Sequence, residues 1–243
     1  MLLSIIIPVY NETKRIGLTL KRIIDFMKDK GYIYEIIVVD DGSVDGTPDL
    51  VSKKFAASGA VKVLRNELNH GKGYVVRQGM LDARGDVLFY TDADLASPIQ
   101  DMEKMLLLIN SGYDVVVGSR VIKDSEAKVK RVFWRYIIGR IFNFLVRVIA
   151  VGGVTDTQCG FKMFTRGAAK KIFSRQKIHT YTFDVEIMYL AKRLGLKIKE
   201  VPVSWSEVKD TKVKFVRDSL MMFRDLVRIR ILHRGKDEFV AKE

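Results

Sequence analysis

The chain has 243 residues, a single cysteine and a formal net charge of +13. A chain of this length suits one large α/β domain, or one domain with an appendage. It should bury roughly 70–75% of its unfolded surface, so its stability requires neither a disulfide nor a structural metal. The single cysteine excludes an internal disulfide and fits a reducing compartment.

Strand and helix patterns alternate through the first half of the chain. Residues 35–40 form an apolar run that ends in acid, and residues 13–28 carry apolar side chains at helical spacing. This alternation predicts an α/β fold with a doubly wound, mostly parallel sheet. Strands are expected at 4–9, 35–40, 61–64, 86–91 and 114–118, and helices at 13–28, from Thr47, at 72–83 and at 98–110.

The alternation breaks after Arg120. A short strand is expected near 158–164, a helix at 183–194, a strand near 197–205 and a long helix at 214–233. We therefore expect one domain over residues 1–212, which includes a basic amphipathic insertion at 123–151. A basic amphipathic helix and tail over 213–243 follow it.

The positive charge is concentrated around that insertion. Between Arg120 and Arg147 there are eight Lys or Arg residues and two acidic ones. Such a block indicates a partner with phosphate groups, on nucleotides, lipids or nucleic acid. Residues 128–149 combine this basic face with a wide aromatic and aliphatic one, which is typical of a helix in a lipid headgroup layer. Packing on the protein's own core is the alternative.

No membrane crossing is expected. Residues 1–9 are too short and lack the basic start of a secretory signal, so they favour a first strand. The longest apolar stretch, 132–151, contains Arg135, Arg140 and Arg147. Each of these would cost a few kcal/mol inside a bilayer. We expect a cytoplasmic protein that lies on the cytoplasmic face of a membrane.

Two carboxylates follow the strand at 86–91. Asp92 and Asp94 stand one residue apart, where open α/β sheets bind their ligands. Hard oxygen ligands at this place suit Mg²⁺ or Mn²⁺ that carries a diphosphate. The alternative is that both aspartates only cap the next helix, but Ser97 is expected to do so.

Two further strands end in acidic residues. Residues 8–12 read Pro-Val-Tyr-Asn-Glu, and residues 40–43 read Asp-Asp-Gly-Ser. Carboxylates accept hydrogen bonds from ribose hydroxyls and base N–H groups, which a nucleoside offers. Taken singly, 40–43 could be only an Asx turn, and Tyr10 and Glu12 could be surface residues. Together with Asp92 and Asp94 they predict a nucleotide site.

The chain resembles the family 2 inverting glycosyltransferases with a GT-A fold. It is most similar to the polyprenyl- and dolichyl-phosphate sugar synthases, and among them to the dolichyl-phosphate β-glucosyltransferases. The mannosyl branch usually has a glutamine where this chain has Ala96. The matching segments are 8–12, 40–43, 69–73, 92–94, 118–120, 156–162, 183–186 and 201–207.

The resemblance implies roles for individual residues. Asp92 and Asp94 would be catalytic and would hold the metal, and Arg120 would clamp the acceptor phosphate with help from Arg131 and Lys162. A nucleotide contact is expected from Pro8, Tyr10, Glu12, Asp40, Asp41 and Lys72, and a sugar or acceptor contact from Gln158, Asp184 and Glu186.

Simpler roles stay open for several of these residues. Arg120 could be a surface arginine after a Gly-Ser turn, and Lys72 an exposed lysine that caps a loop. Asp184 and Glu186 could interact only with a helix dipole. Cys159 has no local signature of a nucleophile and is interpreted as structural.

The implied reaction moves a hexose, glucose being favoured, from a nucleotide-diphosphate sugar such as UDP-glucose to a polyprenyl phosphate with inversion. A lipid phosphate has its second pKa near 6, so it is ionised at pH 7 and needs no general base. The alternatives are a GDP-mannose-dependent mannosyltransferase and a transferase with a hydroxyl acceptor. A nucleotidyltransferase should have a glycine- and arginine-rich phosphate loop directly after the first strand, and residues 8–12 do not form one. Acidic strand ends repel the phosphates of nucleic acid unless a metal intervenes, so nucleic acid is not an expected partner.

Overall fold

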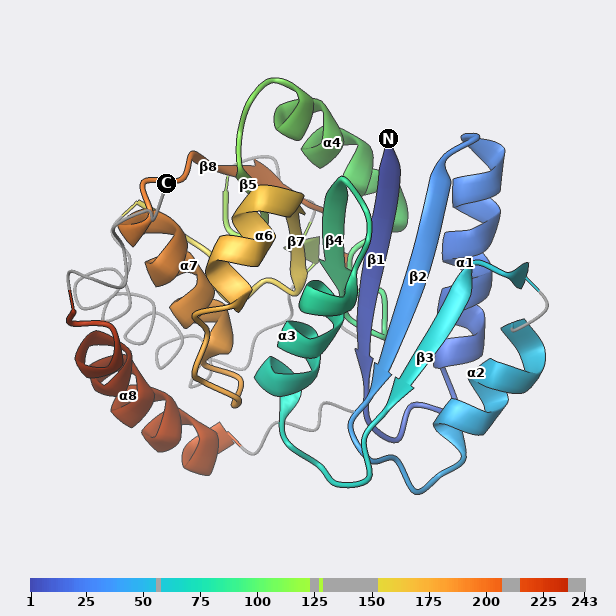
Figure 1. Cartoon of the computed structure of the whole chain (residues 1–243), viewed down its shortest axis with the longest axis horizontal. Coiled ribbons are helices and arrows are strands. Elements are labelled where there is room, and N and C mark those ends of the chain that lie inside the picture. Colours follow the sequence, from blue (N-terminus) through green and yellow to red (C-terminus); the bar gives the residue numbers. More distant parts are fainter. Residues whose placement is uncertain (56–57, 123–126, 129–152, 207–214, 236–243) are drawn as a thin grey trace.

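The computed structural model describes residues 1–55, 58–122, 127–128, 153–206 and 215–235 (Figure 1). A seven-stranded sheet runs through the molecule in the order β3-β2-β1-β4-β7-β5-β8. Only β7 runs antiparallel to its neighbours β4 and β5 within this sheet. The strands are β1 (Leu2–Val9), β2 (Ile33–Asp40), β3 (Val61–Arg65), β4 (Val87–Thr91), β5 (Val115–Ser119), β7 (Phe161–Thr165) and β8 (Ile198–Pro202).

Helices cover both faces of this sheet (Figure 1). The central strands are apolar on both sides: in β1, Ile5 and Ile7 pack into one core and Ile6 into the other. Such two-sided burial is typical of parallel sheets. Helices α1 (Ile16–Asp29), α2 (Thr47–Phe55) and α4 (Met102–Asn110) contribute to the first core, and α3 (Lys72–Asp82), α6 (Arg166–Phe173), α7 (Phe183–Arg193) and α8 (Phe215–Leu232) to the second. The expected doubly wound, mostly parallel fold is confirmed.

Helix α6 was not expected from the sequence. The side chain of Thr165 caps it by accepting a hydrogen bond from the Ala168 backbone N–H at 3.2 Å. Ala168, Ala169, Ile172 and Phe173 are buried at helical spacing. A threonine cap followed by apolar residues at this spacing is a signal for a helix. Here the signal is confined to a helix of only eight residues.

The expected Ser97 cap is wrong. The segment begins as a 3₁₀ turn, η2 (Ile99–Asp101), and no side chain caps either this turn or α4. The expected strand at 197–205 is also divided, because β8 ends at Pro202 and a separate short strand, β9 (Trp205–Ser206), follows. Strand β9 pairs with β6 (Ala127–Lys128) in a second, two-stranded sheet.

Helix α8 packs on α7, and its side chains Leu226 and Ile229 are fully buried in the second core. Apart from residues 127–128, the insertion expected at 123–151 lies outside the described residues, as does the junction at 207–214. The division into residues 1–212 and 213–243 therefore stays a prediction. Among the helices that the structure describes, none is both long enough and apolar enough to cross a membrane.

Candidate active site

The loops that follow β1 and β2 are joined by hydrogen bonds. The Asp41 N–H donates to the Val9 carbonyl at 2.9 Å, and the Asn11 N–H donates to Ser43 Oγ at 2.8 Å. Asn11 adopts a left-handed conformation (φ +52°), and its side-chain oxygen accepts the Val44 N–H at 2.9 Å. The two acidic strand ends therefore form one continuous edge of the site.

Asp40 and Asp41 have different environments at this edge. The Asp41 carboxylate accepts the backbone N–H groups of His70 (2.8 Å) and Gly71 (2.9 Å), so it holds the glycine-rich turn. Its expected role as a nucleotide contact stays a prediction. Asp40 is fully buried; its Oδ2 accepts the Ser43 N–H at 3.0 Å, while its Oδ1 has no hydrogen-bond partner among the described residues. A buried oxygen of this kind is suited to accept a hydrogen bond from a bound ligand.

The residues expected at the end of β1 are only partly accessible. Pro8 lies buried inside β1 opposite Val39, and its expected nucleotide contact stays a prediction. Tyr10 is 39% exposed at the end of the strand. The Glu12 carboxylate forms an ion pair with Arg15 at 2.6 Å. Roles for Tyr10 and Glu12 stay predictions.

The glycine-rich turn is pressed against a distant segment of the chain. Gly71 has a left-handed conformation (φ +100°), and a β-carbon there would lie 2.5 Å from the His179 carbonyl oxygen. The Gly73 N–H donates to the same oxygen at 2.8 Å. A β-carbon on Gly73 would lie 2.6 Å from the Ile178 carbonyl oxygen. Only glycine fits on either side of Lys72. The close contact of the two glycines with residues 178–179 fixes the position of the Lys72 backbone.

Lys72 forms an ion pair with Asp92 at 2.7 Å. The Tyr90 hydroxyl donates to Asp92 Oδ1 at 3.1 Å, and Lys72 Nζ lies 5.6 Å from the centre of the Tyr90 ring. Burial lowers the pKa of Lys72, but Asp92 and then Asp184 raise it by more, so the ammonium stays charged. The expected phosphate lysine is thus held beside the expected metal carboxylate.

Asp94 is fixed by its own loop. Its Oδ1 accepts the Ala96 N–H at 3.1 Å, across Leu95 in a left-handed conformation (φ +48°). The buried hydroxyl of Thr19 in α1 donates to the Ala93 carbonyl at 2.7 Å and so holds the turn from the other side. Burial raises the pKa of Asp94, and the neighbouring Asp92 raises it further. Two carboxylates this close repel each other, and a cation would relieve that repulsion.

The carboxylates of Asp92 and Asp94 are suitable ligands for a divalent cation. Within the described ranges, no group of three or more His, Cys, Asp or Glu side chains is arranged to hold a metal ion. Mg²⁺ is commonly held by one or two carboxylates together with substrate phosphates and water, so two ligands fit such a site. Gly160 lies directly against Asp92, and a β-carbon there would collide with the Asp92 carboxylate.

Arg120 is bound by Asp156. Its Nε and Nη2 each reach a carboxylate oxygen of Asp156 at 2.8 Å, and its backbone N–H donates to the same carboxylate at 3.0 Å. The guanidinium carbon lies 5.9 Å from the centre of the Trp205 ring. Burial raises the pKa of Asp156, but Arg120 lowers it by more. In all, 29% of the Arg120 side chain is exposed.

Lys162 is fully buried and does not reach the surface. Its ammonium forms an ion pair with Asp184 and donates to the Cys159 carbonyl at 2.6 Å. The expected contact between Lys162 and a lipid phosphate is therefore wrong. Asp184 is buried as well; burial raises the pKa of Asp184, and Lys162 opposes this. Its expected sugar or acceptor contact stays a prediction.

Glu186 is fully buried and also serves the interior. Its two oxygens accept the backbone N–H groups of Lys177 (2.9 Å) and Ile178 (2.8 Å), and Oε1 lies 2.7 Å from His233 Nε2. The expected sugar or acceptor contact from Glu186 is wrong, because a fully occupied buried carboxylate has no surface for substrate. Gln158 is half-buried and its role stays a prediction. Arg131 lies outside the described residues.

Tyr181 was not expected near the site from the sequence. This side chain is 41% exposed, and its hydroxyl contributes to the raised pKa of Lys72. An aromatic residue two positions before the segment 183–186 was the available signal. Cys159, by contrast, is buried, and burial raises the pKa of its thiol to about 12, which agrees with a structural role.

The sheet order and the acidic strand ends together define the nucleotide-diphospho-sugar transferase class with a GT-A fold. Solved structures agree with this fold. Glucosyl-3-phosphoglycerate synthase from Mycobacterium tuberculosis, in complex with UDP, has a TM-score of 0.67 at 20% identity, over 93% of this chain and 79% of that chain. Mannosyl-3-phosphoglycerate synthase from Rubrobacter xylanophilus has a TM-score of 0.66 at 20% identity, over 100% of this chain and 76% of that chain.

The chain belongs to glycosyl transferase family 2, whose model matches residues 4–173. It is 39% identical to the dolichyl-phosphate β-glucosyltransferase of Dictyostelium discoideum, over 94% of this chain and 73% of the relative. It is 39% identical to the enzyme of that name from Saccharomyces cerevisiae (95% and 75% covered) and 35% identical to the one from Homo sapiens (94% and 75% covered). The resemblance expected from the motifs is confirmed, and the protein is a hexosyltransferase.

Proposed function

We propose that the protein transfers glucose from UDP-glucose to dolichyl phosphate, with inversion, on the cytoplasmic face of a membrane. The observation that carries this proposal is the Asp92 and Asp94 pair at the end of β4, with Lys72 and Arg120 beside it. The names of the relatives, which are 35–39% identical, support the sugar and the acceptor.

The proposed cofactor is Mg²⁺ or Mn²⁺, held by Asp92 and Asp94. Glucosyl-3-phosphoglycerate synthase has been solved with Mn²⁺ and UDP-glucose, which supports a divalent ion on this fold. Such an ion neutralises charge on the leaving diphosphate. The Tyr90 hydroxyl holds the Asp92 carboxylate toward the site, and the Thr19 hydroxyl fixes the turn between the two aspartates.

The remaining residues divide the substrates between them. Asp40 Oδ1 would accept a hydrogen bond from the nucleoside, which satisfies its buried oxygen. Lys72 would bind the diphosphate once that anion competes with Asp92 for its ammonium. Arg120, whose side chain is 29% exposed, would hold the acceptor phosphate, which is already ionised and attacks without a general base.

The test is transfer of radiolabelled sugar to dolichyl phosphate by the purified protein, with and without Mg²⁺ or Mn²⁺. We expect label from UDP-glucose in the lipid product only when the metal is present. Label from GDP-mannose in its place would overturn the sugar assignment. Transfer to a hydroxyl acceptor while dolichyl phosphate stays unlabelled would overturn the acceptor assignment.

Gly160→Ala tests whether the position of Asp92 matters for transfer. The new β-carbon would collide with the Asp92 carboxylate and displace it, while the surrounding sheet keeps its packing. We expect the rate of glucosyl transfer to fall about 10²-fold, since displacing a catalytic group by about 1 Å commonly costs that much. Gly167→Ala is the matched control, because no atom would lie within 4 Å of a β-carbon at that position. A normal rate in Gly160→Ala would contradict the role of Asp92.

The proposed attachment to the membrane is supported by the outer face of α8. Arg224, Val227, Arg228 and Ile231 are exposed at helical spacing, and the two apolar side chains are 45% and 58% exposed. Basic and apolar side chains on one face suit an anionic lipid surface. Asp225, next to Arg224 in the sequence, is buried. A polyprenyl chain is costly to lift out of a bilayer, at about 0.8 kcal/mol per CH₂, so the enzyme must reach the surface.

Arg224→Glu/Arg228→Glu should weaken binding to anionic vesicles. Each basic residue near such a surface contributes about 1 kcal/mol, so losing two should weaken binding at least about tenfold. Sedimentation with phosphatidylserine vesicles measures this, and the binding of wild type should weaken as salt rises. Lys53→Glu/Lys54→Glu on α2 makes the same charge change at two exposed residues elsewhere and should bind as wild type. Equal losses in both variants would show only an effect of net charge.

A further inference from the structure

Helix α8 is tied by buried polar contacts to the segment that precedes α7. Asp225 is 1% exposed, and its Oδ2 accepts the hydroxyls of Thr180 at 2.7 Å and Thr182 at 3.2 Å. Just beyond the end of α8, the fully buried His233 contacts Glu186 at 2.7 Å. Residues 176–182 are therefore held at two places. Asp225 binds the hydroxyls of Thr180 and Thr182, and Glu186, which contacts His233, binds the backbone N–H groups of residues 177 and 178.

The same segment lies against the glycine-rich turn on its other side. Gln176 Nε2 donates to the Gly73 carbonyl at 2.8 Å, and the Gly73 N–H donates to the His179 carbonyl at 2.8 Å. The His179 ring also packs edge-on against Tyr74 of α3, at 5.2 Å between ring centres. In Figure 1 this segment, which follows α6, lies between α3 and α8. Hydrogen bonds thus connect α8, through this segment, to Gly73 on one side of Lys72, and Gly71 on the other side packs against the same segment.

Lys72 has little freedom in this arrangement. Its ammonium forms the ion pair with Asp92, while the backbone on either side is set by the close contact of Gly71 and Gly73 with residues 178–179. A shift of that segment must move the turn, because no space remains between them. Buried hydrogen-bonded carboxylates fix such a segment in one place, since each is costly to leave unpaired.

We propose that Asp225 and Glu186 are positioning residues for Lys72, which they hold toward the diphosphate of the donor through residues 176–182. This inference rests on the proposed role of Lys72 in binding that diphosphate. It assigns α8 a second task beside its proposed contact with the membrane. Asp225 belongs to α8 and touches neither Lys72 nor Asp92, so its effect must pass through Thr180 and Thr182.

A double-mutant cycle tests this coupling. The variants are Asp225→Ala, Lys72→Met and the combination, with UDP affinity measured by calorimetry and the KM for UDP-glucose by initial rates. We expect Asp225→Ala to weaken UDP binding about tenfold in the wild-type background and to have no further effect once Lys72 is methionine. Asp225→Asn should restore most of the affinity, because its amide oxygen still accepts the two hydroxyls. If Asp225→Ala fails to fold, Thr180→Val removes the shorter of the two bonds and replaces it in the cycle.

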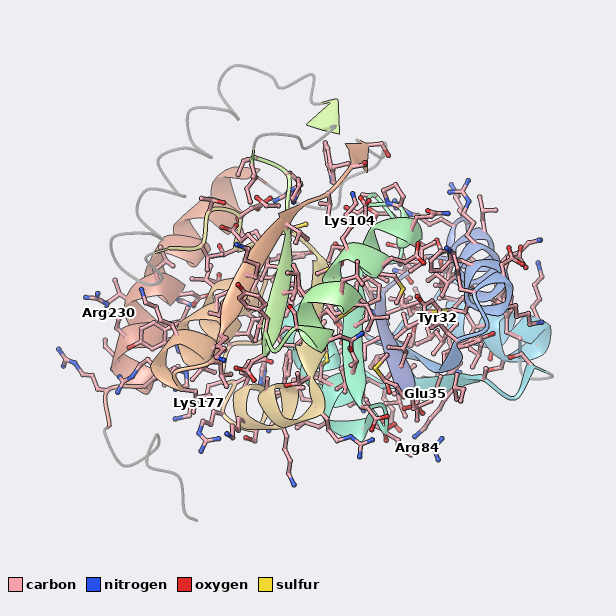
Figure 2. All side chains as sticks on the ribbon, turned by 90° about the horizontal axis from the view of Figure 1, so that it is seen from above. Tyr32, Glu35, Arg84, Lys104, Lys177 and Arg230 are labelled. Atoms are coloured by element: carbon pink, nitrogen blue, oxygen red, sulfur yellow. The ribbon has the colours of Figure 1, made fainter. Side chains whose placement is uncertain are left out.

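Glu35→Ala is the matched control for loss of a buried carboxylate. Glu35 is 8% exposed, accepts the Ser4 hydroxyl at 2.6 Å and the Arg84 N–H at 2.7 Å, and starts the buried part of β2. Figure 2 shows Glu35 and Arg84 far from Lys177 and Arg230, which mark the segment and α8. This variant should melt at a lower temperature and keep its UDP affinity.

The outcomes separate the inference from the proposed function. If Lys72→Met binds UDP as wild type does, the assigned role of Lys72 is wrong. If Lys72→Met weakens binding but Asp225→Ala has the same effect in both backgrounds, the role of Lys72 stands and the coupling is overturned. An affinity loss in Glu35→Ala equal to that in Asp225→Ala would also overturn it, because general destabilisation would then explain the result.

Discussion

Asp94→Asn is expected to lower the rate of glucosyl transfer at least about 10²-fold, the usual cost of removing an electrostatic group that stabilises a transition state. The substitution keeps the oxygen that accepts the Ala96 N–H at 3.1 Å, so the loop keeps its conformation. It removes the negative charge that faces Asp92, and with it a ligand of the proposed metal. The melting temperature should stay the same or rise slightly, because two crowded carboxylates become one.

Three measurements test this expectation. Transfer to dolichyl phosphate is followed at saturating Mn²⁺, melting is followed by calorimetry, and Mn²⁺ binding in the presence of UDP is followed by electron paramagnetic resonance. Asp82→Asn is the control. Asp82, at the end of α3, forms an ion pair with Lys62 of β3 at 2.7 Å, and loss of this ion pair should leave the rate unchanged. More than about a tenth of the wild-type rate in Asp94→Asn would contradict a metal role for Asp94.

Lys162→Met is expected to lower the free energy of unfolding by about 3–5 kcal/mol, the usual cost of removing one partner of a buried ion pair. Lys162 is fully buried and Asp184 is 4% exposed, so the carboxylate would be left without its cation in the interior. The melting temperature should fall by on the order of 10 °C for a chain of this size. A residue that only touched a lipid phosphate at the surface would instead change the KM for the acceptor and leave the stability intact.

A second variant separates burial of an unpaired charge from a general loss of packing. Lys162→Met/Asp184→Leu removes both charges and should recover much of the stability, because apolar pairs often replace buried ion pairs at little cost. Lys104→Met is the surface control: its ion pair with Asp101 spans 2.8 Å, but the lysine side chain is 56% exposed (Figure 2 labels Lys104). Such pairs contribute about 1 kcal/mol or less. Equal losses in Lys162→Met and Lys104→Met would refute the interpretation.

The strand ends were predictable because their signal is local. An apolar run that stops at Asp40 or at Asp92 records, within a few residues, both a buried strand and a polar edge. Parallel strands bring their carboxyl ends to one side of a sheet, so these residues had to lie near one another. Helix α6 was missed because its eight residues are a short pattern next to a strand.

The roles of individual charged side chains were less predictable. Lys162, Asp184 and Glu186 lie in motifs with the composition of a binding site, yet the structure turns all three inward. Asp41 beside Asp40 shows the same limit, since one carboxylate holds a loop and its neighbour keeps an unpaired oxygen. Residue type alone does not distinguish a carboxylate that binds substrate from one that binds backbone.

The sequence by itself determined most of the succession of strands and helices along the chain, apart from α6 and the division of the strand at 197–205, together with the acidic edge of the sheet and the family. The tertiary structure decided which charges meet. Arg120 pairs with Asp156 across 36 residues, and Glu186 meets His233 across 47. Periodicity reports whether a side chain is buried, but the partner of a buried charge is chosen by how distant segments pack. Because a buried charge is costly to leave unpaired, its partner determines whether the side chain can contact a substrate.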